Sequence, residues 1–191
     1  MNQIALAILL GFCIDCCLGD PHGLPHPVVL IGKLISGLEK GFRGLLPETP
    51  AGERVAGGLI WIFTTAVSFF VPWGILRLCG LVSPWLVLGV ESIMCWQIIA
   101  PRSLRDESMK VYHALKTGTI EQARYAVSRI VGRDTQQLDP AAVARAAVET
   151  VAENASDGVI APLLFLALGG APLGFFYKAV NTMDSMLGYV E

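Results

Sequence analysis

The chain has 191 residues, of which 53% are hydrophobic and 16% are charged. Soluble domains carry about 25% charged residues, so this composition, with a mean hydropathy of +0.57, favours a membrane protein over a soluble domain. The formal net charge of −2 gives no support to nucleic-acid binding, and we expect no nucleic-acid partner.

Residues 4–18 form the first apolar run, which contains a single acid, Asp15. The residues before the run carry no positive charge and no small-residue cleavage site follows it, so we expect a retained helix rather than a cleaved signal peptide. Cys13 and Cys16 have the spacing of a redox or metal pair but lack a second ligand pair. They are better interpreted as small residues that pack between helices.

The polar connection at 19–54 opens with GDPHGLPHPV, in which glycine and three prolines predict a rigid, non-helical turn. Asp20, His22 and His26 can act there as ligands or acid–base groups, and a purely structural turn is the open alternative. Apolar residues then recur with helical spacing between positions 28 and 42. This pattern predicts an amphipathic helix that lies along the membrane surface.

Two long apolar runs follow, at 55–76 and 78–101. The first carries no charge and the second carries one, and each is long enough to span a hydrocarbon core of about 30 Å. We expect the turn between them at Arg77. Pro72 and Pro84 are expected to kink or end the helices, which membrane bundles tolerate.

Two acids, Asp15 and Glu91, fall inside apolar runs. An ionisable side chain at membrane depth is costly unless it faces the interior of the bundle and finds a partner. We therefore expect both acids to be buried inside the bundle, with Arg102 or Lys178 as partners.

The second polar connection, 102–157, is predicted to form soluble helices within the same membrane domain. Counting Lys and Arg finds none before residue 19, four in 19–54, one at Arg77 and eight in 102–157. This distribution places both polar connections in the cytoplasm by the positive-inside rule. The predicted helix-starting signals are Ser103, the capping-box pair Thr119 and Gln122, and the cap-and-proline pair Asp139 and Pro140.

The last apolar run, 158–177, is interrupted by GGAP at 169–172. The part before the interruption is too short to cross a bilayer at 1.5 Å per residue. Two interpretations stay open: a single broken helix, or a re-entrant pair that returns Lys178 to the side of Asp157.

The stretch ETVAENASDG precedes this run. Glu149 and Glu153 are four residues apart and share a helical face, and Asp157 follows one turn later. Clustered carboxylates are hard oxygen ligands, which suit Mg²⁺, particularly Mg²⁺ shared with a nucleotide phosphate. A solvated acidic helix face that ends at Gly158 is the open alternative.

The stretch YKAVNTMDSMLGY follows the run. Helical spacing places Lys178, Asn181 and Ser185 on one face, with Asp184 beside them. Such a stripe can hold a phosphate and a metal together, and an interfacial helix with a snorkelling lysine is the alternative. The two stretches can cooperate only if Asp157 and Lys178 lie on one side of the membrane, which favours the re-entrant interpretation.

These motifs, in this order, resemble the adenosylcobinamide-phosphate synthase family of cobalamin biosynthesis, the CobD/CbiB group. The matching blocks are Asp15 with GDPHGLPHPVVLIG, and ETVAENASDGVIAPLLFLALGGAPLGFFYKAVNTMDSMLGY. The resemblance covers the whole chain, more weakly between residues 37 and 97. It implies a multi-pass protein of the cell (inner) membrane that joins adenosylcobyric acid to (R)-1-amino-2-propanol, or its phosphate, in an ATP- and Mg²⁺-dependent amide ligation.

Each candidate residue is assigned a role in this implied reaction according to the chemistry of its side chain. Glu153, Asp157 and Asp184 are predicted to bind Mg²⁺, and Lys178 to bind phosphate. Glu149 or His26 is the candidate base that deprotonates the amine. Substrate or nucleotide oxygens are expected on Asp20, Asn154, Ser156, Asn181 and Ser185.

The expected fold is all-α: a multi-pass helical membrane protein with amphipathic and soluble helices in cytoplasmic loops and a broken or re-entrant last apolar segment. Family members continue beyond the segment that ends at Glu191, so we expect a fragment or a short form, and a homo-oligomer is possible. Two other functions stay open. A transporter would use the buried acids as an ion path, and a non-catalytic membrane sensor or assembly protein would bind no nucleotide.

Overall fold

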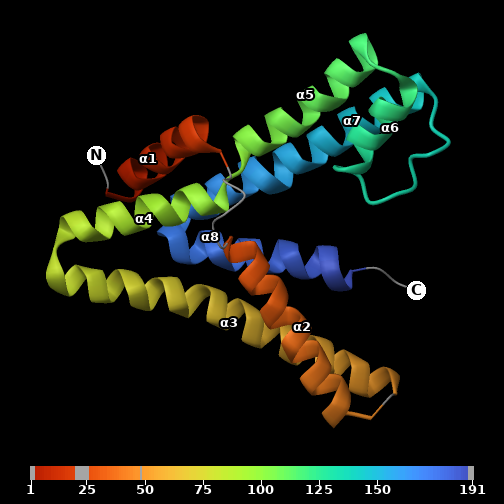
Figure 1. The fold of residues 1–191 in the computed structure, drawn as a ribbon. Coiled ribbons are helices and arrows are strands. Elements are labelled where there is room, and N and C mark those ends of the chain that lie inside the picture. Colours follow the sequence, from red (N-terminus) through yellow and green to blue (C-terminus); the bar gives the residue numbers. More distant parts are fainter. Residues whose placement is uncertain (1–2, 20–25, 48, 189–191) are drawn as a thin grey trace.

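The computed structural model describes residues 3–19, 26–47 and 49–188, and all regular elements in these ranges are helical (Figure 1). Within them, three segments are long and apolar enough to cross a membrane: Pro50–Val82, Pro84–Thr117 and Pro140–Leu187. This confirms the expected all-α membrane fold. The helices are α1 (Gln3–Leu18), α2 (Pro27–Leu45), α3 (Pro50–Val82), α4 (Pro84–Ile98), α5 (Pro101–Thr117), α6 (Ile120–Ser128), α7 (Pro140–Ala155), the π-helix η1 (Ser156–Ile160) and α8 (Ala161–Leu187).

Helices α1–α4 and α8 form one part of the molecule, which we call the body. The second half of α8 lies at its centre and packs against α1, α2, α3 and α4. Figure 1 shows α3 and α4 as a long hairpin, with α1 beside α4 and α2 crossing α3. The buried core is mostly aliphatic, with Phe175 as its aromatic member and Ile35, Ile98 and Leu166 fully enclosed.

Helix α2 has the predicted amphipathic pattern, but its apolar face is covered by protein. Ile31 and Ile35 are buried in the core of the body, and Leu38 and Phe42 pack against the same cluster. The stripe therefore packs against α3 and α8. The prediction of the amphipathic helix is confirmed, and its position along the membrane surface stays a prediction.

The turn between the two long membrane helices lies at Ser83, six positions beyond the expected turn at Arg77. Ser83 caps α4 by accepting the Trp85 N–H at 3.2 Å, and Pro84 occupies the first turn, where its missing N–H costs nothing. Arg77 lies within α3, and its guanidinium lies 5.1 Å from the centre of the Trp73 ring, one turn earlier. A cation–aromatic pair of this kind gives the charge a partner without ending the helix.

Helices α5, α6 and α7 form the second part of the molecule, which we call the lobe. It has its own core, distinct from that of the body, around Val111, Ala123, Val127, Val143 and Ala146. Two predicted starts are confirmed. Thr119 and Gln122 form a reciprocal capping box on α6, and Asp139 accepts the Ala142 N–H at 2.7 Å to begin α7.

The predicted N-cap Ser103 is wrong, because α5 begins two residues earlier at Pro101. Its first turn is capped from elsewhere in the chain: the buried Asp15 carboxylate on α1 accepts the Arg102 N–H at 3.0 Å. The Arg102 side chain extends back and donates to the backbone carbonyls of Cys16 and Cys17. Asp15 thus lies inside the molecule with Arg102 as a partner, as predicted, but through the backbone amide rather than the guanidinium.

Candidate functional site

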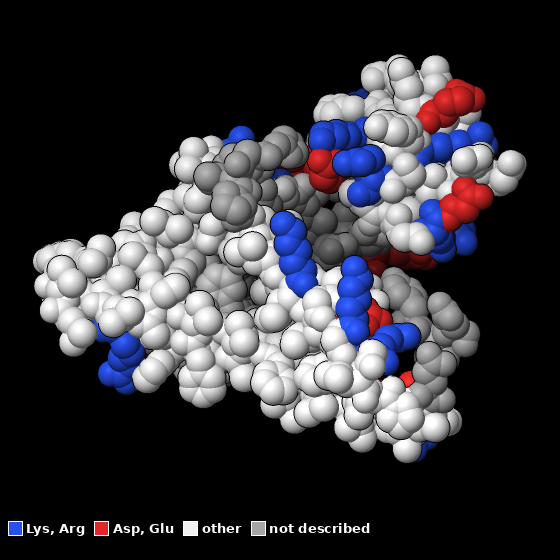
Figure 2. Space-filling model, turned by 60° about the horizontal axis from the view of Figure 1, so that its bottom comes forward, with Lys and Arg blue, Asp and Glu red and all other residues white. Residues whose placement is uncertain are grey.

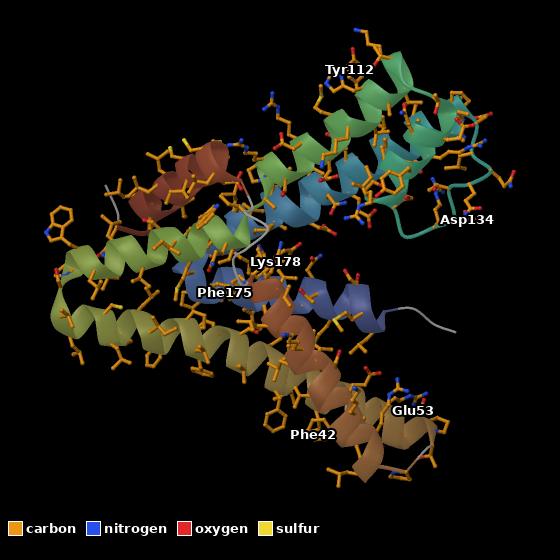
Figure 3. All side chains as sticks on the ribbon, viewed as in Figure 1. Phe42, Glu53, Tyr112, Asp134, Phe175 and Lys178 are labelled. Carbon is orange, nitrogen blue, oxygen red and sulfur yellow. The ribbon has the colours of Figure 1, made fainter. Side chains whose placement is uncertain are left out.

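The last apolar segment reverses direction inside the body. Helix α8 is interrupted at Gly169 and at Gly170, which has φ = +66° and ψ = −161°. Figure 1 shows the chain running from α7 into the first half of α8 and then back again toward the C-terminus. The segment is therefore broken, and its second half returns Lys178 to the side on which α7 ends (Figure 3).

The reversal creates a cleft between the lobe and the body, with a volume of about 330 Å³. Figure 2 shows a hollow between these two parts, with Lys and Arg side chains gathered near it and an almost uncharged surface over much of the body. The lining residues come from α5, the end of α6, α7, η1 and α8: Ala100, Ser103, Leu104, Glu107, Arg129, Ile130, Thr150, Asn154, Gly158 and Lys178. We call this space the interhelical cleft.

The two connections between lobe and body, at the start of α5 and at η1, both border the interhelical cleft. The Ala100 N–H donates to the Gly158 carbonyl at 3.4 Å and links the start of α5 to η1. The π-helix adds an extra residue to the turn between α7 and α8, and such turns are frequent at functional sites. Asp157 lies in this turn, half-buried, and interacts electrostatically with Tyr177 on the returning half of α8.

Two of the predicted site residues meet in the interhelical cleft. Asn154 and Lys178 line it together, although one comes from each of the two motifs. The Asn154 amide donates to the Thr150 carbonyl at 3.0 Å, which leaves its oxygen as an acceptor. The cleft therefore presents an ammonium group and an amide oxygen to whatever occupies it.

Other members of the first motif point elsewhere. Glu149 is exposed and forms a 3.1 Å ion pair with Arg133 rather than lining the interhelical cleft. Glu153 and Ser156 are also exposed on the surface of α7 and η1. The i,i+4 argument correctly placed Glu149 and Glu153 on one helix, but that face is turned toward solvent and Arg133.

The second motif is divided between the cleft and the free surface. Asn181 is half-buried one turn after Lys178, and its backbone carbonyl accepts the Ser185 hydroxyl at 3.0 Å. Asp184 and Ser185 are exposed near the end of α8. Only the first turn of this stripe therefore faces the interhelical cleft.

The proline-rich motif is described only at its end, because Asp20 and His22 lie outside the described residues. His26 caps α2, with Nδ1 accepting the Val28 N–H at 3.3 Å. A neutral imidazole that accepts at Nδ1 carries its proton on Nε2. The geometry consequently favours a hydrogen-bond donor role for Nε2 of His26 over the predicted role as a base.

The described residues contain no group of three His, Cys, Asp or Glu side chains that could hold a metal ion together. Glu153, Asp157 and Asp184 therefore do not form a resident three-carboxylate site for Mg²⁺. The interhelical cleft contains groups that suit an anion: Arg129 and Lys178 supply positive charge, and Ser103 and Asn154 supply polar groups. The one carboxylate in its lining, Glu107, is paired with Lys110. This donor set fits phosphate oxygens, including those of a nucleotide that carries its own Mg²⁺.

Sequence reasoning missed Arg129, Ser103 and Glu107. Ser103 was assigned to a cap, and the two charged residues look like ordinary surface residues of soluble helices. Glu107 also pairs with Lys110 on its own helix. No spacing in the sequence relates Arg129 to Lys178, because the packing of the lobe on the body brings them to one cleft.

Comparison with known proteins agrees with this arrangement of motifs. The model of the CobD/Cbib protein family matches residues 8–191. The chain is 48% identical over 189 residues to the cobalamin biosynthesis protein CobD of Geobacter metallireducens, which covers 99% of this chain and 58% of that protein. It is 46% identical over 184 residues to the cobalamin biosynthesis protein CbiB of Salmonella typhi, with 96% of this chain and 57% of that protein covered.

The chain spans less than three-fifths of the length of these curated relatives. No solved structure matches it. The matched region nevertheless includes both motifs that border the interhelical cleft, and its extent leaves no doubt about descent: the chain belongs to the CobD/CbiB family.

Proposed function

We propose that the interhelical cleft belongs to the active site of an ATP-dependent amide ligase of cobalamin biosynthesis. The reaction joins the carboxyl group of adenosylcobyric acid to (R)-1-amino-2-propanol, or to its phosphate, and gives adenosylcobinamide or its phosphate. Its longer relatives are named cobalamin biosynthesis proteins. The activity is proposed for full-length family proteins, of whose length this chain spans less than three-fifths.

The observation that carries the proposal is the meeting of Asn154 and Lys178 in one cleft. They come from two motifs separated by an apolar segment, and a straight helix would place them far apart, since each residue adds 1.5 Å. The reversal at Gly170 returns Lys178 to the lobe. A cleft that combines two cations with amide and hydroxyl groups, and whose one carboxylate, Glu107, is paired with Lys110, is a binding environment for phosphate-bearing substrates.

The chemistry requires an activated carboxyl group. The substrate carboxylate attacks the γ-phosphorus of ATP, forming an acyl phosphate and releasing ADP. The amine nitrogen then attacks the carbonyl carbon, a C–N bond forms, the C–O bond to phosphate breaks and inorganic phosphate leaves with both electrons. The amine loses one proton, so the balance is carboxylate, amine and ATP giving amide, ADP and phosphate.

Each cleft residue has a role in this balance. Lys178 and Arg129 offset the negative charge that accumulates when a carboxylate and a triphosphate approach one another. Asn154 and Ser103 orient phosphate or substrate oxygens, and Asn181 extends the polar surface along α8. The apolar body on one side of the cleft limits the access of water, which would otherwise hydrolyse the acyl phosphate.

We propose that Mg²⁺ binds together with the phosphates of the nucleotide. Mg²⁺ is commonly held by one or two carboxylates together with substrate phosphates, and Asp157 in η1 is the protein ligand that we propose. Glu153 and Asp184 are exposed and stay candidates for a role in the complete protein.

We also propose that the lobe faces the cytoplasm, where ATP is available. The Lys and Arg count favours this orientation. Arg77 lies in α3 rather than in a turn. The numbers of Lys and Arg in the two polar connections, four and eight, do not depend on this difference.

The test is an amidation assay on protein purified in lipid nanodiscs. Adenosylcobyric acid, Mg-ATP and aminopropanol phosphate are supplied, and the amide is measured by mass spectrometry together with ADP. We expect Lys178→Met to lower the rate by about 100-fold or more, as removal of a preorganised transition-state donor does. Arg145→Met is the matched control, because Arg145 is exposed on α7 and does not line the cleft.

Three results would contradict the proposal. The first is an amidation rate of Lys178→Met within twofold of the unaltered protein. The second is an equal loss in Arg145→Met. The third is substrate flux across proteoliposomes without ADP formation, which would identify a transporter instead.

A further inference from the structure

Glu91 lies deep in the body and takes no part in lining the interhelical cleft. Its side chain is on α4, and the residue is only 5% exposed. The carboxyl group lies against the break in α8, beside the backbone N–H of Ala171, the residue that follows Gly170. A buried acid at membrane depth is expensive and is retained where it serves a purpose.

The geometry of the break matches this carboxylate closely. A Cβ atom built on Gly170 would lie 2.3 Å from Oε1 of Glu91, a separation that real Cβ atoms essentially never show. Gly170 also has φ = +66°, a conformation that glycine adopts at little cost and other residues rarely adopt. Both the missing side chain and the positive φ are thus needed for the carboxylate to reach the Ala171 N–H.

The second half of α8 begins at this point, and its first amides have no carbonyl one turn earlier to bond. In water, solvent would satisfy them, but inside the body only protein groups are available. A carboxylate is also favoured at a helix N-terminus by the helix dipole. Glu91 is therefore placed to supply the cap that the Gly-Gly sequence itself does not contain.

We propose that Glu91 is the positioning residue of the active site: it fixes where the returning half of α8 starts and thereby places Lys178 in the interhelical cleft. Lys178 lies two helical turns beyond Ala171, roughly 10 Å along a rigid helix. A change in the start of the helix is transmitted to Lys178, whereas Glu91 itself touches no substrate. The consequence for catalysis rests on the proposed function, but the anchoring of α8 does not.

The test compares Glu91→Gln with Glu91→Leu in the purified full chain. Both variants remove the charge and keep a similar volume, and only glutamine retains an acceptor for the Ala171 N–H. Hydrogen–deuterium exchange is followed by mass spectrometry on peptides that cover residues 165–180. We expect exchange about tenfold faster or more in Glu91→Leu, because a buried amide loses its acceptor, and nearly unchanged exchange in Glu91→Gln.

Ser92→Ala is the matched control. Ser92 is buried next to Glu91 on α4, but its hydroxyl donates only within that helix, to the Leu88 carbonyl at 2.7 Å. Exchange in residues 165–180 should be unchanged in this variant. If Ser92→Ala accelerates exchange as much as Glu91→Leu, the effect is a general loosening of α4 and the proposal is wrong.

The remaining outcomes also support or contradict the anchoring role of Glu91. Unchanged exchange in Glu91→Leu, or equally fast exchange in Glu91→Gln, excludes an anchoring role for the acceptor. Failure of Glu91→Leu to fold while Glu91→Gln folds supports that role, and failure of both contradicts it. The amidation rate is measured in parallel: altered exchange with an unaltered rate leaves the anchor in place and refutes only its link to catalysis.

Discussion

Helices of the lobe and helices that start in the body obtain their N-terminal caps from different sources. Thr119 and Asp139 cap α6 and α7 from within the adjacent sequence. Helix α5 and the second half of α8 begin where the chain leaves or crosses the body. Asp15 on α1 caps the first of them, and Glu91 on α4 is the cap that we propose for the second. The difference shows where local sequence is sufficient to start a helix and where it is not.

The physical reason is the availability of water. The first amides of a lobe helix are solvated if the cap is lost, so a cap contributes about 1 kcal/mol. An amide in the body has no such alternative, and an unsatisfied buried donor costs about 1–3 kcal/mol. We therefore expect substitutions at the body caps to cost more than substitutions at the lobe caps.

The largest effect is expected for Gly170→Ala. The positive φ costs about 1–2 kcal/mol for a residue with a Cβ, and the contact with Glu91 adds overpacking of about 1–3 kcal/mol. Equilibrium denaturation of the detergent-solubilised protein should show a loss of about 2–5 kcal/mol. Gly89→Ala is the control, because a Cβ there meets open space on α4. A comparable loss of stability in that variant would show that the break at Gly170 does not specifically require glycine.

A smaller loss is expected for Asp15→Leu. The Arg102 N–H loses a charged acceptor in a buried setting, and we expect the free energy of unfolding to fall by about 2–3 kcal/mol. Asp15→Asn keeps an acceptor oxygen and should recover more than half of the loss. If the leucine and asparagine variants are equally stable, hydrogen bonding by Asp15 does not hold α5 to α1.

The lobe counterpart is Asp139→Ala, which removes the cap of α7. We expect a cost of about 1 kcal/mol, visible as faster hydrogen exchange in the first turns of α7 with no change in the body. Gln137→Ala is the control, an exposed residue just before the same cap. A loss in the free energy of unfolding equal to that of Asp15→Leu would show that caps in the lobe and in the body contribute equally to stability.

The smallest effect is expected at the ion pair between Arg133 and Glu149. Both side chains are more than half exposed, at 59% and 58%, so solvent screens their attraction. Glu149→Gln should change the free energy of unfolding by less than about 0.5 kcal/mol. A double-variant cycle with Arg133→Met measures the pair directly, and a coupling above about 1 kcal/mol would show a buried network that this geometry does not contain.

Much of the local structure could be predicted from the sequence. The capping box at Thr119, the start of α7 at Pro140 and the interruption at 169–172 were all predicted and are present. These features depend on residues within a few positions of one another, so a single sequence contains the information. The start of α5 was misplaced because a distant acid caps it. The turn was misplaced because a single charge at Arg77 was weighed above the local Ser83 and Pro84 signal that ends α3 and starts α4.

The candidate site was also predicted in part from local sequence and decided in part by packing. Lys178 and Asn154 were selected because polar residues beside an apolar segment require an explanation, and they do meet in the cleft. Glu149 was selected on the same grounds and pairs with Arg133 at the surface instead. Helical spacing relates residues on one face, but it does not determine whether that face is turned toward a cleft or toward solvent.

By itself, the sequence determined the class of fold, the apolar segments and the break in the last of them, because hydrophobicity, proline and glycine act over short distances. Only the tertiary structure decided that α8 reverses, that Glu91 lies beside the Ala171 N–H, and that Arg129 joins Lys178 in the interhelical cleft. These outcomes depend on which buried amide finds which acceptor once the helices pack. In a low-dielectric interior an unpaired backbone amide is costly, and its partner can come from any part of the chain.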